Sequence, residues 1–251
     1  MFKRILIANR GEIALRVIRA CHEIGVEAVA VYSQADATSP HLEEADQAVC
    51  IGGSQSAESY LNMTAILQAA EQTECKAIHP GYGFLAENAL FAELCSQLKF
   101  TWIGPAPRVI RLMGDKATAR ETMKAAGVPV IPGSEGVVRK LERARELASD
   151  IGYPVLLKAT AGGGGKGMRV VREPAGFAEA FQQASMEAGK AFGNPGLYME
   201  RYIEGGRHIE FQFMADSFGN VVHLGERECS VQRNHQTLVA ESPSPLIDAE
   251  T

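Results

Sequence analysis

In the first hundred residues, short apolar runs alternate with segments in which apolar residues recur at helical spacing. Short apolar runs predict strands, and between them apolar residues recur every three to four positions, as on one face of a helix. The expected strands are 4–8, 28–32, 48–51, 76–79 and 100–103, and the expected helices run from 13 to 25, from 62 to 70 and from 88 to 98. This alternation predicts an α/β unit with a doubly wound, mainly parallel sheet covered by helices.

The second half of the chain predicts two smaller groups of elements. Strands at 153–158, 168–171 and 197–202, with helices near 140–151 and 175–188, predict a small α+β unit with the character of a lid. After it, the segment 208–214 alternates strictly between polar and apolar residues, with His208, Glu210 and Gln212 on one face. A turn at 217–220 leads to a second strand, so we expect a hairpin.

A run of four glycines is the main candidate for chemistry. It lies between Lys158 and Lys166, where side-chain packing gives no reason for glycine, but a bare backbone with flanking lysines suits a polyphosphate. The run joins two expected strands instead of opening a helix, which argues against a dinucleotide-binding loop. A Walker loop is excluded because Gly167 follows Lys166. We expect a strand–loop–strand flap, with a flexible linker as the alternative.

Two polar loops follow strands of the expected parallel sheet, at 9–12 and at 79–84. Ligands of open α/β sheets bind at the carboxyl ends of the strands. The second loop presents His79 and Tyr82, either as part of a binding rim or as a structural turn with a buried histidine; the residues leave both readings open. Lys116, in a helical connector, is by itself compatible with a solvated lysine.

Composition limits the remaining classes of function. The chain has 251 residues, of which 46% are hydrophobic and 22% charged, and its net charge of −5 favours no nucleic-acid partner. It contains no apolar run of about 20 residues, so we expect no membrane span and a cytoplasmic location. Five cysteines at irregular spacing predict reduced thiols, with Cys229 set among polar residues. The linear spacings typical of zinc sites and of hydrolase nucleophiles are absent, and we assign no metal ligand.

Several longer motifs occur together in one order along the whole chain. They are Ile5–Ala14, His79–Asn88, Met113–Lys116, Lys158 with its glycines, Arg207–Glu210 and Gly225–Arg233. Taken together, these motifs resemble the biotin carboxylase component of biotin-dependent carboxylases, such as acetyl-CoA carboxylase of fatty acid biosynthesis.

The resemblance implies an ATP-grasp fold and a division of the chain into four segments. A Rossmann-like N-terminal domain (1–104) would be followed by a helical connector (105–130), a lid with the glycine flap (131–203) and the incomplete start of a third α+β domain (204–251). The site residues it implies are, for ATP phosphates, Lys116 and Lys158; for the flap, Gly164, Gly165 and Met168; for the adenine, Glu200, Arg201, Tyr202 and Ile203; for the ribose, His208; near the nucleotide, Gln232 and His235; and near biotin, Tyr82.

The resemblance also implies a reaction in two steps. Bicarbonate attacks the γ-phosphate of ATP, with Mg²⁺ or Mn²⁺, to form carboxyphosphate, whose breakdown supplies CO₂ to biotin. The implied partners are a biotin carrier protein or domain, a carboxyltransferase component and, for the full-length protein, a second copy in a homodimer. A closing flap with lysines suits this chemistry, which needs neutralised phosphoryl charge and exclusion of water.

The sequence departs from the family pattern at the bicarbonate site. Thr237 replaces a lysine, and Ala240, next to Glu241, replaces a glutamate. The family's metal-binding glutamates, biotin-anchoring arginine and general base would lie beyond Thr251, so the catalytic residues stay unassigned, and we expect the 251-residue chain to be inactive alone. Two alternatives remain: an ATP-grasp ligase similar to carbamoyl-phosphate synthetase, and a non-catalytic nucleotide-binding module.

Overall fold

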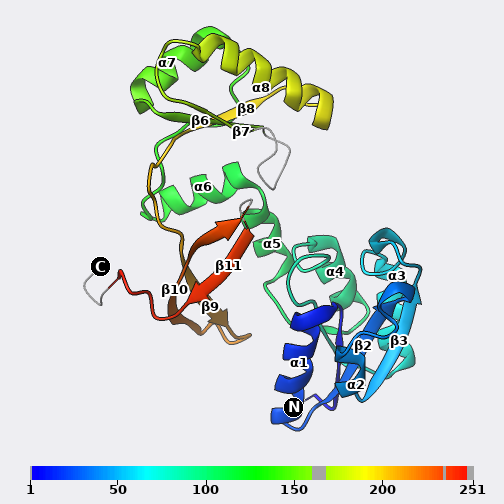
Figure 1. The fold of residues 1–251 in the computed structure, drawn as a ribbon. Helices are drawn as coiled ribbons and strands as arrows, with labels where there is room; N and C mark the ends of the chain where they lie inside the picture. The colour runs from blue at the N-terminus through cyan, green and yellow to red at the C-terminus, as the bar shows by residue number, and fades with distance from the viewer. Residues whose placement is uncertain (1, 160–167, 234–235, 248–251) are drawn as a thin grey trace. The chain divides into compact units, whose positions relative to one another are not determined.

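The chain folds into two compact units. The structure, a computed structural model, describes residues 2–159, 168–233 and 236–247, without the side chains of Lys116, Ala117, Phe192 and Gln236. One unit spans Met1–Gly127 and the other Val128–Thr251. Figure 1 labels most of the helices and strands of both units.

The first unit contains a five-stranded parallel sheet with the strand order β3-β2-β1-β4-β5. Its strands are β1 (Arg4–Ile7), β2 (Glu27–Ser33), β3 (Gln47–Gly52), β4 (Ala77–His79) and β5 (Thr101–Trp102). All five strands expected from the apolar runs are present. The order reverses between β1 and β4, which is the point where open α/β sheets bind their ligands.

Helices cover both faces of this sheet. They are α1 (Gly11–Glu23), α2 (His41–Glu44), α3 (Met63–Gln72) and α4 (Ala89–Gln97), with short 3₁₀ turns at Gln34–Asp36 and Ser56–Glu58. Ile5 and Ile7 of β1 pack on one face with Ile18 of α1, whereas Leu6 packs on the other face with Ile66 and Phe91. Successive residues of one strand are therefore buried on opposite faces, and the doubly wound prediction is confirmed.

Two helices occupy the expected connector. They are α5 (Pro107–Gly114) and α6 (Lys116–Ala125). The carboxylate of Asp115 caps α6 by accepting a hydrogen bond from the backbone amide of Thr118 at 2.8 Å. This cap places Lys116 at the first position of the helix, where a lysine is unfavourable to the helix dipole.

The second unit begins with an antiparallel sheet that has its own core. It consists of β6 (Val155–Ala159), β7 (Met168–Val171) and β8 (Leu197–Arg201) in the order β7-β6-β8. Two helices, α7 (Leu141–Ile151) and α8 (Phe177–Phe192), contribute apolar side chains to a core around Leu157. Figure 1 shows both helices packed on this sheet. Residues 133–138 run along the free edge of β8, with Ser134 and Val138 amides donating to its carbonyls at 2.7 Å.

A second antiparallel sheet follows, with the order β11-β10-β9. Its strands are β9 (Ile209–Ala215), β10 (Val221–Arg233) and β11 (Gln236–Glu241). The expected hairpin of β9 and β10 is confirmed. The sequence analysis assigned no strand to β11; this strand pairs with β10, with Gln232 directly opposite Thr237.

Two further expectations concern the whole described chain. No described helix is both long and apolar enough to cross a membrane. All five cysteines are among the described residues and are free thiols; Cys50 is exposed and the other four are buried. The four-segment division of the chain stays a prediction.

Candidate functional site

The glycine run connects β6 and β7, which are neighbouring antiparallel strands. In the register of β6 and β7, Lys158 is opposite Met168, so the ends of both strands flank residues 160–167. The predicted strands on both sides of the glycine run are confirmed, because a strand and not a helix follows it. Gly164 and Gly165 lie outside the described residues.

Lys158 forms an ion pair with a second residue of the predicted nucleotide site. Its Nζ donates to Oε2 of Glu200 on β8 at 2.5 Å, and the two side chains are 27% and 24% exposed. Glu200 is two positions along β8 from the residue directly opposite Lys158, so the pair is a diagonal cross-strand contact. The fold thus joins two predicted site residues that are 42 positions apart in sequence.

Backbone contacts hold the segment that leaves β8. The amide of Arg201 donates to the carbonyl of Pro132, and that of Tyr202 to Pro154, both at 2.8 Å. The guanidinium of Arg201 donates to the carbonyl of Ile151 at 3.2 Å. Tyr202 is half-buried and Ile203 is 55% exposed. The predicted adenine segment is therefore fixed at its start and exposed at its end.

Other predicted nucleotide residues lie at the sheet of β9–β11. His208 immediately precedes β9, and its imidazole is 51% exposed. Its amide donates to Oγ of Ser230 at 2.7 Å, and the Gln232 side-chain amide donates to the Cys229 carbonyl at 2.9 Å. Gln232 is directly opposite Thr237, which occupies the predicted bicarbonate position. His235 lies outside the described residues.

In the first unit, a buried asparagine joins the two loops at the carboxyl edge of the sheet. Asn9 is 3% exposed, and its Nδ2 donates to the carbonyls of Pro80 and Tyr82, both at 2.7 Å. Gly81 has φ of +63°, and a Cβ there would lie 2.7 Å from the Asn9 amide nitrogen. Glycine is required at this position because both the backbone conformation and the close approach exclude a side chain.

His79 and Tyr82 differ in exposure on this edge. The half-buried His79 accepts a hydrogen bond from the Gly81 amide at 3.0 Å through Nδ1, and burial lowers its pKa. A neutral histidine that accepts a hydrogen bond within the turn agrees with the second alternative for this loop, a structural turn with a buried histidine. Tyr82 is 60% exposed, and its hydroxyl donates to Glu12; that hydrogen bond raises the pKa of the phenol. Tyr82 is thus available to a ligand, whereas His79 is engaged.

Sequence reasoning missed a polar cluster beside this edge. The guanidinium of Arg10 lies 5.4 Å from the Tyr60 ring centre and 5.6 Å from that of Phe84, and its Nη1 is 3.3 Å from Asp36. The Tyr60 hydroxyl donates to the same carboxylate at 2.7 Å. Burial, and to a smaller extent this hydrogen bond, raises the pKa of Tyr60 to about 12. Only the aromatic Tyr60 within a polar stretch could have hinted at the cluster.

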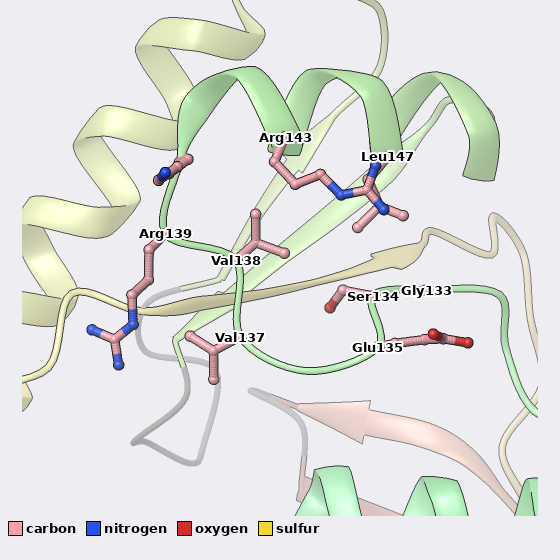
Figure 2. A pocket seen from close by; sticks show the side chains of 9 residues that line it. Gly133, Ser134, Glu135, Val137, Val138, Arg139, Arg143 and Leu147 are labelled. Carbon is pink, nitrogen blue, oxygen red and sulfur yellow. The ribbon is translucent and has the colours of Figure 1, made fainter.

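A cavity of about 520 Å³ lies along residues 133–147 of the second unit. Its charged lining residues are Glu135, Arg139, Lys140 and Arg143. Figure 2 shows that Arg139 and Arg143 extend in different directions, so their charges do not converge on one point. The described lining includes none of the predicted site residues.

Comparisons with known proteins decide the family. Residues 1–110 match the model of the biotin carboxylase N-terminal domain, and residues 115–251 match the model of the carbamoyl-phosphate synthase L chain ATP-binding domain. The chain belongs to the biotin carboxylase family. Its fold is accordingly that of an ATP-grasp protein preceded by a doubly wound domain, as the sequence predicted.

Biotin carboxylases of other organisms are similar over the whole chain. The enzyme of Nostoc sp. is 59% identical over 249 residues, which are 99% of this chain and 56% of the relative. The chain thus spans about half the length of the curated relatives it matches. A crystal structure of a biotin carboxylase complex from Campylobacter jejuni has a TM-score of 0.91 at 53% identity and covers 100% of this chain and 56% of that one.

A third relative is informative about ligands of the family. It is the biotin carboxylase domain dimer of Hydrogenobacter thermophilus 2-oxoglutarate carboxylase, in complex with MgADP, ADP and bicarbonate. Its TM-score is 0.89 at 52% identity, with coverage of 100% of this chain and 55% of that one. Membership in the biotin carboxylase family confirms the resemblance, while the roles of the individual site residues stay predictions.

Proposed function

We propose that this chain is the ATP-binding part of a biotin carboxylase. In the proposed reaction, bicarbonate attacks the γ-phosphate of ATP and the resulting carboxyphosphate supplies CO₂ to a ureido nitrogen of biotin on a carrier protein. Family membership and the ADP and bicarbonate complexes of a relative support this proposal.

The observation that carries the proposal is the position of Lys158. Lys158 is opposite Met168 at the strand ends that the glycine run connects, and the described partner of its ammonium group is Glu200. An ammonium beside a run of bare backbone amides suits a polyphosphate, which supplies the oxygens that both groups bind. On binding, the Lys158 ammonium would contact a phosphate oxygen in place of, or in addition to, the Glu200 carboxylate. Glu200 could then accept a hydrogen bond from the nucleotide.

The chain's own residues supply electrostatics and exclusion of water in this proposal. Lys158 and Lys116 would neutralise charge that spreads over the transferring phosphoryl group, and closure of segment 160–167 over the nucleotide would keep water from carboxyphosphate. Thr237 would offer a hydroxyl where the family pattern has an ammonium. We therefore expect weak bicarbonate binding in this chain compared with family members that carry the lysine.

The proposal also includes a divalent ion and protein partners. Mg²⁺ prefers oxygen ligands, and the described residues present no group of three carboxylates close enough to share one ion. We assign no residue to that ion. A biotin carrier protein or domain, a carboxyltransferase component and a second copy in a homodimer are the proposed partners.

Nucleotide binding tests the Lys158 assignment directly. We expect titration calorimetry with a non-hydrolysable ATP analogue to show at least about tenfold weaker binding after Lys158→Ala, because a charge-assisted phosphate contact is lost. Lys140→Ala, at an exposed lysine of the same unit, is the matched control and should bind as the unchanged chain does. Equal affinities of all three proteins would contradict the assignment.

Turnover separates the proposal from a related ligase. Because we expect the 251-residue chain to be inactive alone, turnover is measured on the full-length protein. A biotin carboxylase with its carrier protein should then cleave ATP only when both bicarbonate and biotin are present. An enzyme similar to carbamoyl-phosphate synthetase is the second candidate, because residues 115–251 match that ATP-binding domain. It would need bicarbonate and an ammonia source but no biotin. ATP cleavage independent of biotin would therefore reject the first candidate.

A further inference from the structure

The backbone around Tyr82 is held by the buried Asn9 of the neighbouring loop. The Asn9 side-chain amide donates to the carbonyls of Pro80 and Tyr82, both at 2.7 Å, and its Oδ1 accepts a hydrogen bond from the Arg10 amide at 2.9 Å. Both polar atoms of this side chain therefore have partners, which fixes its orientation. Because the two carbonyls are two positions apart, Asn9 holds the backbone on both sides of the turn that carries the tyrosine.

The other end of Tyr82 is held by Glu12. The Tyr82 hydroxyl donates to Oε1 of Glu12, which lies in the first turn of α1, where the helix dipole favours a carboxylate. The tyrosine is nevertheless 60% exposed. The loop after β1 thus holds Tyr82 at its backbone and at its hydroxyl, and leaves the ring open to a ligand.

The loop after β4 is also held where it ends, at Phe84. This residue has φ of +43°, a conformation that is unfavourable for a residue with a bulky side chain. Its ring stacks on Tyr60 with the ring centres 5.0 Å apart, and the Arg10 guanidinium lies 5.6 Å from its centre. These contacts stabilise the unfavourable conformation, so the loop that carries Tyr82 is fixed before any ligand binds.

The contact with Glu12 decides which hydrogen bonds the Tyr82 phenol can offer. A phenol has one donor, and a carboxylate can only accept, so the oxygen of Tyr82 is left as an acceptor. The hydrogen bond to Glu12 also raises the pKa of the phenol above its ordinary value, so the hydroxyl stays protonated at neutral pH. The ureido ring of biotin carries two N–H donors and one carbonyl. The oriented phenol therefore matches an N–H of that ring and not its carbonyl.

We propose that Asn9 and Glu12 are positioning residues that present the Tyr82 oxygen as a hydrogen-bond acceptor for a ureido N–H of biotin. This inference rests on the proposed biotin carboxylase function. Asn9 sets the place of the ring, and Glu12 sets the direction of the hydroxyl proton. A side chain that is fixed beforehand loses less conformational entropy on binding, so both residues act on the KM for biotin and leave kcat unchanged.

Kinetics of the full-length protein with free biotin test the two residues. Glu12→Ala should raise the KM for biotin about threefold to tenfold, the effect of releasing one side chain. In a Tyr82→Phe background the same change should have no further effect, because the hydroxyl that Glu12 holds is absent. Asn9→Ala should likewise raise this KM, and should have no effect in a Tyr82→Ala background. A residue that only stabilised the fold would add its effect in both backgrounds.

NMR titration tests the Glu12 contact without any ligand. In the 251-residue chain with labelled tyrosines, the Tyr82 resonance is identified by its loss in Tyr82→Phe. Its pKa should fall toward the ordinary phenol value in Glu12→Gln, because a neutral amide accepts a weaker hydrogen bond than a carboxylate. Glu43→Gln, at an exposed glutamate in the first turn of α2, is the matched control and should change neither this pKa nor the KM.

The possible failures of the two proposals differ. ATP cleavage that does not depend on biotin would overturn the proposed function and this inference with it. Biotin-dependent cleavage would overturn the inference alone if Glu12→Ala left the KM unchanged or acted additively with Tyr82→Phe. A Tyr82 pKa that Glu12→Gln does not alter would do the same. Circular dichroism identifies an Asn9→Ala protein that fails to fold, and the variants of the exposed Glu12 then decide.

Discussion

The sheets β7-β6-β8 and β11-β10-β9 share strand number and antiparallel pairing but differ in burial. The first has its own apolar core with side chains from α7 and α8, and Leu157 is fully buried there. In the second, the only buried side chains of its described residues are Glu228 and Cys229, while Phe213 and Leu238 are 62% and 64% exposed.

The difference shows that backbone pairing and side-chain burial are separable. Both sheets pair their backbones in antiparallel ladders, although those of β10 with β9 and β11 contain register shifts. Only the first removes a large apolar area from water, which is the main source of folding free energy. Three experiments, in order of decreasing expected effect, test whether this contrast holds in solution.

The largest effect should come from truncating a core leucine. Leu157→Ala should lower the free energy of unfolding by about 2–5 kcal/mol, because it removes buried methyl groups and leaves a cavity. The matched change Leu238→Ala in β11 should alter it by no more than about 0.5 kcal/mol, as for an exposed side chain. Urea unfolding measures both. Comparable losses for the two variants would show that Leu238 is buried in solution.

Cross-strand ion pairs provide a smaller and more local comparison. Lys158–Glu200 is mostly buried, whereas the Arg227–Glu210 side chains are 50% and 37% exposed. Double-mutant cycles should give a coupling of about 1–2 kcal/mol for the first pair and about 0.2–0.5 kcal/mol for the second, since water screens exposed charges. The cycles would use Lys158→Met with Glu200→Gln, and Arg227→Met with Glu210→Gln.

Salt provides the control for these cycles. At about 1 M NaCl the Debye length falls to about 3 Å, so the coupling of the exposed pair should vanish while most of the buried coupling remains. Couplings that are equal, or that fall in parallel with salt, would remove the distinction between the two sheets.

The smallest effect concerns the acid titration of Glu210. The hydrogen bond from Arg227 lowers the pKa of this carboxyl group, against an opposing effect of burial. A lowered folded-state pKa means that the pair stabilises the fold above the unfolded value of about 4.3, and that this contribution is lost as pH falls through the folded pKa. NMR titration should show the Glu210 pKa rising in Arg227→Gln. An unchanged value would mean that the ion pair does not form in solution.

Much of the fold could be predicted from local sequence patterns. Residues such as Ile5, Leu6 and Ile7 are apolar in succession because both faces of the parallel sheet are buried, and that pattern needs no tertiary information. The glycine run was predicted to be a strand–loop–strand segment from the apolar residues on either side. The strand β11 was not predicted, because its run of strand-forming residues, 237–239, is short and follows a polar stretch, and only the pairing with β10 identifies it.

The candidate site was predictable only where the residue type carries the signal. The glycines and lysines of the proposed phosphate site are of this kind, and so is Gly81 in its tight turn. The Arg10 cluster with Asp36 and Tyr60 was missed, because its members are 24 and 26 positions apart and each is ordinary in its local context.

The sequence by itself determined the order of the strands and helices up to β10, the strands on both sides of the glycine run and membership in the biotin carboxylase family, because these depend on residue type and periodicity. Tertiary structure alone decided which distant side chains meet: Lys158 with Glu200, Asn9 with the loop after β4, and His208 with Cys229. The physical reason is that strand register fixes these contacts, and register depends on the pairing of whole strands, which no single segment encodes.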